Sequence, residues 1–237
     1  MRLLAGTSGY AFREWKGLFY PDDLPDDAWL GYYASRFPTV EINNTFYRLP
    51  KEHVLREWAE QVPEPFTFAL KASMRITHHA RLKPECADAL GFLLKNTAVM
   101  GGRLGPILFQ LPPNMKKDLE RLKNFLALLP AGRRFTIEFR HESWFDEDVF
   151  GVLRDRDVAF CIGEQEDFCC PVHATASWGY LRLHRFDYDA AALGRWARRI
   201  AEQEWTDTYV YFKHDEGVGS GPPAVEAFLG AAGPVSG

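Results

Sequence analysis

The sequence lacks the cysteine, histidine and glycine patterns that mark metal, redox and dinucleotide-binding proteins. Its four cysteines are Cys86, Cys161, Cys169 and Cys170, and no two form a CxxC pair, which excludes zinc-ribbon and thioredoxin-like motifs. No HxH or HExxH spacing is present, and the glycines after the first apolar segment read GTSGY rather than GxGxxG. We therefore expect four reduced structural cysteines and no bound cofactor.

Long apolar runs and an excess of positive charge are also missing. No apolar run approaches the roughly 18 residues that a membrane-spanning helix needs. The opening MRLL is followed at once by Gly6, Ser8 and Gly9, so no secretory leader is predicted. The net charge of −4 gives no overall attraction for nucleic acid or for a membrane surface. We expect a cytoplasmic protein that does not bind membranes, and the oligomeric state stays open.

The composition is that of an ordinary globular protein. The 237 residues are 46% hydrophobic and 25% charged, which allows a core of normal size without disulfides or metal ions. Neither a linker nor a low-complexity segment interrupts the chain. We expect a single domain over residues 1–237.

Short apolar segments alternate with amphipathic ones along the chain. The expected strands are 2–7, 39–43, 66–71, 105–111, 134–140, 158–162, 179–184 and 208–213. The expected helices are 28–37, 51–62, 85–100, 115–129, 144–154, 189–201 and 223–229. We expect Asn114, Ser143 and Asp189 to cap helices, and residues 164–175 to form a loop with one helical turn.

This alternation predicts an α/β fold with a parallel sheet. Eight strands within 237 residues fit a single (β/α)₈ barrel of the TIM type. An open doubly wound sheet is the alternative, but the glycine fingerprint that usually accompanies it is missing.

Motifs spread over nearly the whole chain form a specific set. They are GTSGY with Trp15 and FYP at 19–21, VEINNTFYRLP at 40–50, FALKA at 68–72 with Thr77-His78, LGPILFQLPP at 104–113, EFRHESW at 138–144, YLRLH at 180–184 and YVYF at 209–212. As a set they resemble the YecE-like family of uncharacterised proteins, a domain of unknown function. The resemblance implies a TIM-type barrel and no established reaction. Family members often carry His-Gly and Asn-Asn-Asp-like residues where this chain has His184-Arg185 and Lys213-His214-Asp215.

In a barrel of this type the functional site lies at the carboxyl ends of the strands. Polar residues occupy these expected ends in at least six strands. The candidates for catalysis are Glu41, Glu138, His184 and Asp215. The candidates for substrate binding are Asn43, Tyr47, Arg48, Lys71, Gln110, Arg140, Trp144, Arg182 and Lys213. Because side chains two residues apart in a strand share a face, most of these residues are expected to line one pocket.

The charges of these candidates favour an anionic ligand, because arginine suits bidentate contact with phosphate or carboxylate. The predicted function is that of a hydrolase or lyase acting on a small phosphorylated or nucleotide-like substrate, with carboxylates as general acid and base. Arg140 or Arg182 is expected to hold Glu138 ionised. Glu41 would then be the freer carboxylate and the better base.

Three other interpretations stay open. Glu138, Arg140 and Arg182 could be purely structural ion pairs inside the barrel. The barrel could bind a ligand or a nucleic-acid backbone without catalysis, with aromatic residues as a stacking platform. A divalent metal could use Glu41, Glu138, His184 and Asp215, although the neighbouring arginine and lysine side chains would oppose a cation.

Overall fold

The structure, a computed structural model, describes residues 1–214 and 221–233. Its strands are β1 (Arg2–Thr7), β2 (Thr39–Ile42), β3 (Thr67–Lys71), β4 (Leu104–Gln110), β5 (Phe135–Glu138), β6 (Ala159–Gln165), β7 (Phe168–Cys169), β8 (Gly179–Leu183) and β9 (Asp207–Phe212). Its α-helices are α1 (Trp29–Arg36), α2 (Glu52–Glu60), α3 (Ala87–Thr97), α4 (Leu119–Ala127), α5 (Glu147–Arg154), α6 (Ala190–Ala201) and α7 (Pro222–Ala232).

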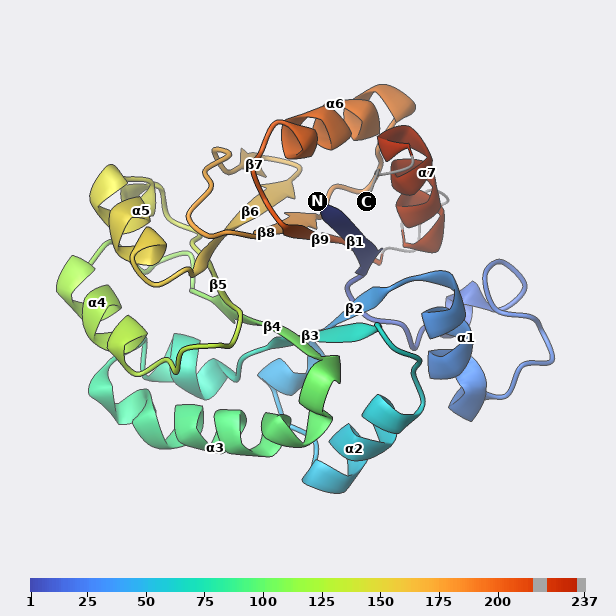
Figure 1. Ribbon diagram of the computed structural model, residues 1–237, viewed down its shortest axis with the longest axis horizontal. Coiled ribbons are helices and arrows are strands. Elements are labelled where there is room, and N and C mark those ends of the chain that lie inside the picture. Colours follow the sequence, from blue (N-terminus) through green and yellow to red (C-terminus); the bar gives the residue numbers. More distant parts are fainter. Residues whose placement is uncertain (215–220, 234–237) are drawn as a thin grey trace.

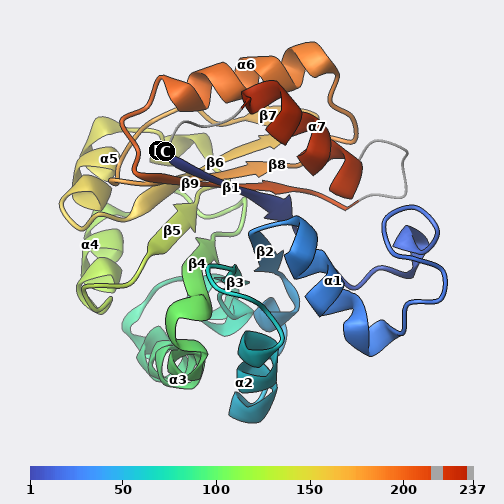
Figure 2. The same ribbon diagram turned by 45° about the vertical axis from the view of Figure 1, so that its right-hand side comes forward.

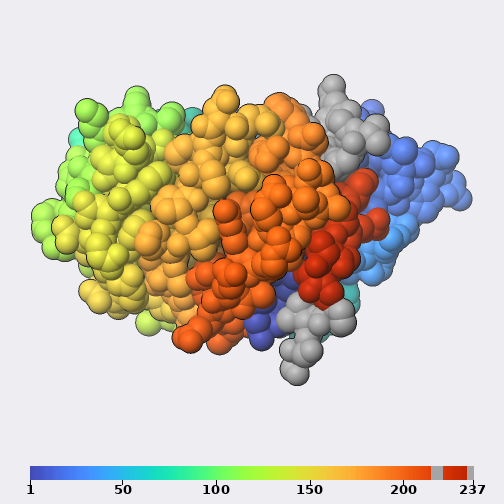
Figure 3. Space-filling model, turned by 90° about the horizontal axis from the view of Figure 1, so that it is seen from above, coloured from blue at the N-terminus to red at the C-terminus, as the bar shows by residue number. Residues whose placement is uncertain are grey.

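The strands form a closed, barrel-like parallel sheet. They pair in the order β1-β9-β8-β6-β5-β4-β3-β2, and only the short β7 lies off this path, antiparallel to β6. The two ends of the order meet through a parallel bridge between Ser8 and Glu41. The helices surround the sheet, and the segments from α5 to α7 make one continuous outer face (Figures 1, 2 and 3). The predicted parallel α/β barrel is therefore confirmed.

The β1–β2 seam is held differently from the other strand pairs. Gly6 lies so close to β2 that a Cβ atom there would come within 2.0 Å of the Thr39 carbonyl oxygen. The hydroxyl of Tyr33, from α1, accepts a hydrogen bond from the Thr7 amide (2.8 Å) and donates one to the Thr39 carbonyl (3.1 Å). A buried tyrosine thus replaces ladder hydrogen bonds at the point where the barrel closes.

The apolar core has two parts, one between the helices and the sheet and one inside the barrel. The inner part combines large aromatic side chains with small ones, namely Leu4, Ala69, Leu108, Ala159, Cys161, Trp178, Tyr180, Tyr209 and Tyr211. Alternate residues of each strand point into the barrel. The residue two positions after a member of this inner layer therefore also points inward, and it lies nearer the carboxyl end of the barrel. This alternation brings Lys71 above Ala69 and Arg182 above Tyr180.

Two local predictions are wrong. Residues 166–178, all of them described, contain no helix, because β6 extends to Gln165 and turns back through β7 as a hairpin. Asp118 and Asp146, rather than Asn114 and Ser143, cap α4 and α5 with their carboxylates. Both helices start later than predicted, since an aspartate closer to the first regular turn accepts the free backbone N–H groups.

The predicted cap at Asp189 is confirmed, because its carboxylate accepts a hydrogen bond from the Ala192 amide at 2.6 Å. No helix within the described residues has the length and apolar character needed to cross a membrane.

The inward face of α4 provides a test of the packing. Leu126 is 1% exposed, whereas Leu128, just beyond the end of the same helix, is 44% exposed. We expect Leu126→Ala to lower the free energy of unfolding by ~2–5 kcal/mol, because truncation leaves a cavity. Leu128→Ala should lower it by less than about 1 kcal/mol. Urea unfolding of both variants measures the difference, and equal losses would contradict the observed packing.

Candidate functional site

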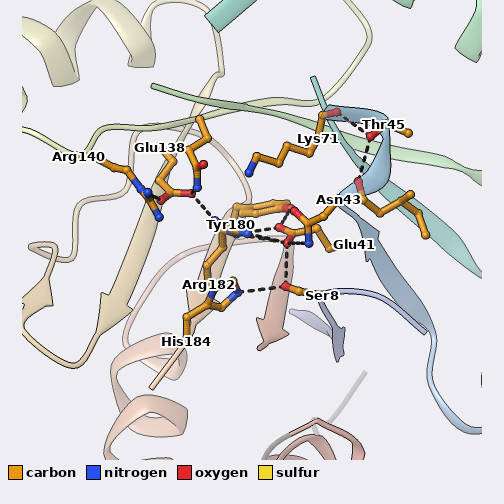
Figure 4. A network of polar contacts seen from close by, with 12 residues as sticks. Ser8, Glu41, Asn43, Thr45, Lys71, Glu138, Arg140, Tyr180, Arg182 and His184 are labelled. Atoms are coloured by element: carbon orange, nitrogen blue, oxygen red, sulfur yellow. Dashed lines mark hydrogen bonds and ion pairs between the residues drawn. The ribbon is translucent and has the colours of Figure 1, made fainter. Parts of the chain in front are cut away.

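The carboxyl ends of the strands carry a connected network of charged and polar side chains (Figure 4). Glu41 and Glu138 lie on opposite sides of Arg182, which bonds to both. The other members are Ser8, Asn43, Gln110, Arg140, Tyr180 and His184. They come from β1, β2, β4, β5 and β8 or from the residues directly after these strands, so the barrel gathers side chains that are far apart in sequence.

Glu41 is completely buried and fully hydrogen-bonded. It accepts from the Arg182 Nε and Nη2 (both 2.9 Å) and from the Tyr180 hydroxyl (2.7 Å). Ser8 and Asn43 donate to its Oε1 at 2.7 and 3.1 Å. Burial alone would raise the pKa of this carboxyl, but the Arg182 charge and the hydrogen bonds lower it to about 2. Glu41 is therefore ionised and a weak base.

Glu138 has fewer partners than Glu41. It accepts from Arg182 Nη1 (2.6 Å), Gln110 Nε2 (2.8 Å) and Arg140 Nε (3.0 Å). Its burial is outweighed by the charges of Arg182 and Arg140, and its pKa is lowered to about 2. The expectation that arginine holds Glu138 ionised is in accord with this geometry. The expectation that Glu41 is the freer carboxylate is wrong, because Glu41 accepts bonds from more donors and is the more deeply buried.

Lys71, the last residue of β3, has a different environment from the two arginines. Its side chain extends toward the middle of the network (Figure 4), yet its amine makes no hydrogen bond or ion pair with residues 1–214 or 221–233. The amine lies 4.3 Å from the centroid of the Phe46 ring. Burial, followed by repulsion from Arg182, lowers the pKa of Lys71 to about 8. A substantial fraction of the amine is thus neutral just above neutral pH.

The position of Phe46 follows from a local hydrogen bond. Phe46 ends a 3₁₀ turn, Asn44–Phe46, that begins directly after β2. The Thr45 hydroxyl donates to the carbonyl oxygen of Lys71 at 2.6 Å, which ties this turn to the end of β3. The aromatic ring is therefore held over the lysine by the backbone of both strands.

Two members of the network, Asn43 and His184, carry further polar atoms that bear on its chemistry. The Asn43 Oδ1 is buried and finds no hydrogen-bond partner in the part of the chain that the structure describes. His184 is half-buried with its Nε2 3.0 Å from the Ser8 hydroxyl. Burial, with Arg182 as the next cause, lowers the pKa of His184 to about 3, so the ring is neutral. For Asn43, burying a carbonyl oxygen without a hydrogen-bond donor costs free energy unless water or a ligand supplies the donor.

A cavity of about 360 Å³ opens beside the network. Arg140, His184 and Lys213 line it from the barrel side. The rest of its wall comes from the β6–β7 hairpin and the segment after β8, namely Gln165, Glu166, Asp167, Phe168 and Phe186. Arg140 bonds to Glu138 through Nε, its side chain is 32% exposed, and it lines the cavity, so part of this side chain is accessible there.

The other predicted site residues are placed as follows. Gln110 joins the network through Glu138. Tyr47 and Arg48 are exposed beyond the end of β2, with Tyr47 76% accessible. Trp144 is not at the mouth: it is fully buried, stacks on Phe139 and donates to the Met115 carbonyl. Asp215 lies outside the described residues.

Sequence reasoning missed Tyr180 and Phe46. Tyr180 lies two residues before Arg182 in the motif YLRLH, so the period of two could have placed it on the same face. Phe46 gave no such signal, because its contact with Lys71 depends on a turn between two strands.

The residues present do not form a ready metal site. Within residues 1–214 and 221–233, no three His, Cys, Asp or Glu side chains gather in a metal-binding group. Both buried carboxylates are already engaged by arginine, whose charge opposes a cation.

Comparison with known sequences assigns the chain to a family. The profile of the family described as "Protein of unknown function DUF72" matches residues 4–235. The chain is a DUF72 protein. Similar curated proteins include the Escherichia coli protein described as "UPF0759 protein YecE", 35% identical over 114 residues, which are 48% of this chain and 42% of YecE. The Bacillus subtilis protein YunF is 31% identical over 143 residues, 55% of this chain and 49% of YunF.

The aligned segments thus span about half the length of these curated relatives, and their names state no activity.

Two solved DUF72 structures share the fold. The protein from Thermotoga maritima gives a TM-score of 0.76 at 24% identity, covering 96% of this chain and 97% of that one. The protein from Enterococcus faecalis gives 0.82 at 17% identity, covering 97% and 95%. At these identities the likeness establishes the fold alone.

Removing Arg182 tests its role in the network. We expect Arg182→Ala to lower the free energy of unfolding by ~3–5 kcal/mol, because two buried carboxylates would lose their shared cation. Arg154→Ala is the control, since the Arg154–Glu147 pair is exposed and should contribute less than ~1 kcal/mol. Urea unfolding at pH 7 measures both. Similar small losses would contradict a structural role for Arg182.

The network also predicts acid sensitivity. The pKa values of Glu41 and Glu138 are about 2 in the fold and 4.5 ordinarily, and that of His184 is about 3 against 6.5. From pH 6.5 downward, the unfolded chain therefore binds more protons than the folded chain does. Stability is complete above this range and is lost as the pH falls toward 2. We expect a decrease of about 3 kcal/mol or more between pH 7 and pH 3, since one unit corresponds to about 1.4 kcal/mol per group.

Urea titrations at pH 7, 5, 4 and 3 test this expectation. Glu138→Gln should flatten the dependence, because one of the responding carboxylates is gone. Glu147→Gln, at an exposed helix position, should leave the slope unchanged. A wild-type stability that stays constant between pH 5 and pH 3 would show that the buried carboxylates do not resist protonation.

Proposed function

We propose that the mouth of this barrel binds a small anionic molecule and that the protein is an enzyme of the hydrolase or lyase class. The observation that carries the proposal is the charge of the network. With Lys71 protonated, the cations Lys71, Arg140 and Arg182 exceed the carboxylates Glu41 and Glu138 by one charge. An anion near Lys71 and Arg140 would balance the excess.

The free donors support the same ligand. Among the residues that the structure describes, the Lys71 amine has no ion-pair partner, and Arg140 uses only Nε in its bond to Glu138. Arginine and lysine donors together suit a phosphate or carboxylate group. Arg182, in contrast, directs Nε, Nη1 and Nη2 at the two carboxylates. Binding of the anion is therefore assigned to Lys71 and Arg140, and Arg182 positions the carboxylates.

Catalysis is favoured over simple binding by the lowered pKa of Lys71. A binding site gains from fully protonated lysine, whereas burial beside arginines lowers the pKa of Lys71 to about 8. Such an amine can act as a base or a nucleophile near neutral pH. The predicted general-base role moves from Glu41, which its donors hold ionised, to this lysine.

A second candidate function rests on the rim of the mouth. Tyr47 and Phe186 are 76% and 57% exposed, and the Lys213 amine lies 4.8 Å from the centroid of the Phe186 ring. Exposed aromatic rings near cations can stack bases of a single-stranded nucleic acid. A non-catalytic ligand- or nucleic-acid-binding barrel is therefore the alternative.

Calorimetric titration with inorganic phosphate, 2-phosphoglycolate and pyruvate at low salt tests anion binding. We expect Arg140→Gln to weaken binding about tenfold or more, because a charge-assisted hydrogen bond contributes ~1.5–3 kcal/mol. Arg156→Gln changes the net charge equally at an exposed position after α5 and should leave the affinity unchanged.

Three outcomes contradict the proposal. One is the absence of heat with all three anions, and another is equal loss of affinity in both arginine variants, which would indicate nonspecific attraction. The third is tight binding of an oligonucleotide that depends on Tyr47 and Phe186 while the small anions do not compete, and this result would favour the second candidate.

A further inference from the structure

The geometry around Lys71 points to covalent chemistry, in a step that rests on the proposed function. We infer that Lys71 forms an imine with the carbonyl group of a substrate that also carries an anionic group. The lysine lies at the end of β3, its side chain extends into the network, and its amine has no ion-pair partner among the described residues (Figure 4). The two functions required of the site, a nucleophilic amine and a place for an anion, are thus adjacent.

Charged groups face Lys71 from several strands. Arg182 of β8 and Arg140 after β5 repel its proton, whereas Glu41 of β2 and Glu138 of β5 attract it. The carboxylates are already neutralised by the arginines, so their attraction is smaller than it would be for unpaired groups. Desolvation adds to the repulsion and favours the neutral amine, which is the form that attacks a carbonyl carbon.

Aromatic side chains also lie near the amine. Phe46 places its ring 4.3 Å away, and His78, in the turn after β3, packs edge-on against Phe46 with ring centroids 4.9 Å apart. Burial, and then the Lys71 charge, lowers the pKa of His78, so this imidazole adds no second charge at neutral pH. The rings of Phe46 and His78 partly exclude water from the amine, and the nearby arginines provide the charge that recognises the anion.

The reaction balances without any further reagent. The neutral amine nitrogen of Lys71 attacks the carbonyl carbon, a carbon–nitrogen bond forms, and the carbon–oxygen double bond becomes a hydroxyl group. The proton that the Lys71 ammonium gave up returns to that hydroxyl group, which leaves as water and forms the iminium, so ammonium plus carbonyl compound yields iminium plus water. An iminium withdraws electrons from the adjacent carbon, which serves a lyase and has no use in a simple hydrolase.

The anionic group sets the substrate class. Arg140 is partly exposed, lines the cavity, and is close enough to Lys71 for its charge to lower the pKa of the amine. A 2-oxo acid or a phosphorylated ketone carries the carbonyl and the anion a few bonds apart, which suits adjacent amine and guanidinium groups. The buried Asn43 Oδ1, for which the described residues offer no donor, can accept a bond from a substrate hydroxyl or from the water released in the reaction.

Reductive trapping tests the inference. The full-length protein is incubated with pyruvate or dihydroxyacetone phosphate and sodium cyanoborohydride, and the modified residue is found by peptide mass mapping. We expect one adduct per chain, at Lys71, with a rate that reaches half its maximum near pH 8. Acetone, which lacks an anionic group, should label about tenfold more slowly or less.

Matched variants distinguish loss of imine formation from loss of the fold. Lys71→Arg keeps the charge and should lose the adduct, whereas Lys116→Arg, at an exposed position, should keep it. Lys71→Met should retain the fold with a thermal midpoint at least as high as wild type, because it removes a charge that has no ion-pair partner within residues 1–214 and 221–233. A lower midpoint would mean that Lys71 is structural.

The failures of the two proposals are distinguishable. Anion binding that depends on Arg140, without an adduct at Lys71, overturns the imine and leaves the proposed function intact. Neither binding nor adduct overturns both. Labelling spread evenly over exposed lysines, or equal labelling by acetone and pyruvate, also overturns the inference, since it shows an ordinary surface amine.

Discussion

The buried ion pairs of Arg182 are the interaction on which the rest of the mouth depends. A single guanidinium at the centre of the barrel satisfies Glu41 on one side and Glu138 on the other. Burying either carboxylate alone would cost a large free energy of desolvation. Burying all three groups together costs much less, because nearly every donor finds an acceptor. Strands β2, β5 and β8, which are not neighbours in the sheet, are thereby held in one arrangement at their carboxyl ends.

Within this arrangement, some charged groups are occupied by bonds inside the network, and others remain available to a ligand. The inner layer is Glu41 with Arg182 and Tyr180, and the side-chain bonds of Arg182 and Tyr180 are directed at Glu41 and Glu138. The available groups lie around it: the Lys71 amine, the terminal nitrogens of Arg140 and the Asn43 oxygen. A largely neutralised centre beside additional cationic groups is a suitable base for recognising an anion.

Membership of the DUF72 family and the barrel fold are established, whereas no reaction comes with either. One fold of this type supports many chemistries, since catalytic groups sit on strand ends and loops that vary independently of the barrel. Function in this chain must therefore be argued from its own side chains. The lowered pKa of Lys71 and the contact of its amine with Phe46 are the features that purely structural ion pairing leaves unexplained.

The sequence by itself determined the strand order along the chain, the parallel barrel and the inward pairing of Glu138 with Arg140, because these depend on local alternation of apolar and polar residues. Only the tertiary structure decided which charges neutralise one another. Glu41 and Arg182 are 141 positions apart, and their contact exists only once β2 and β8 share one barrel. For the same reason the roles of Glu41, Lys71 and Trp144 were beyond sequence reasoning: burial and partners, which set a side chain's reactivity, come from strands distant in the chain.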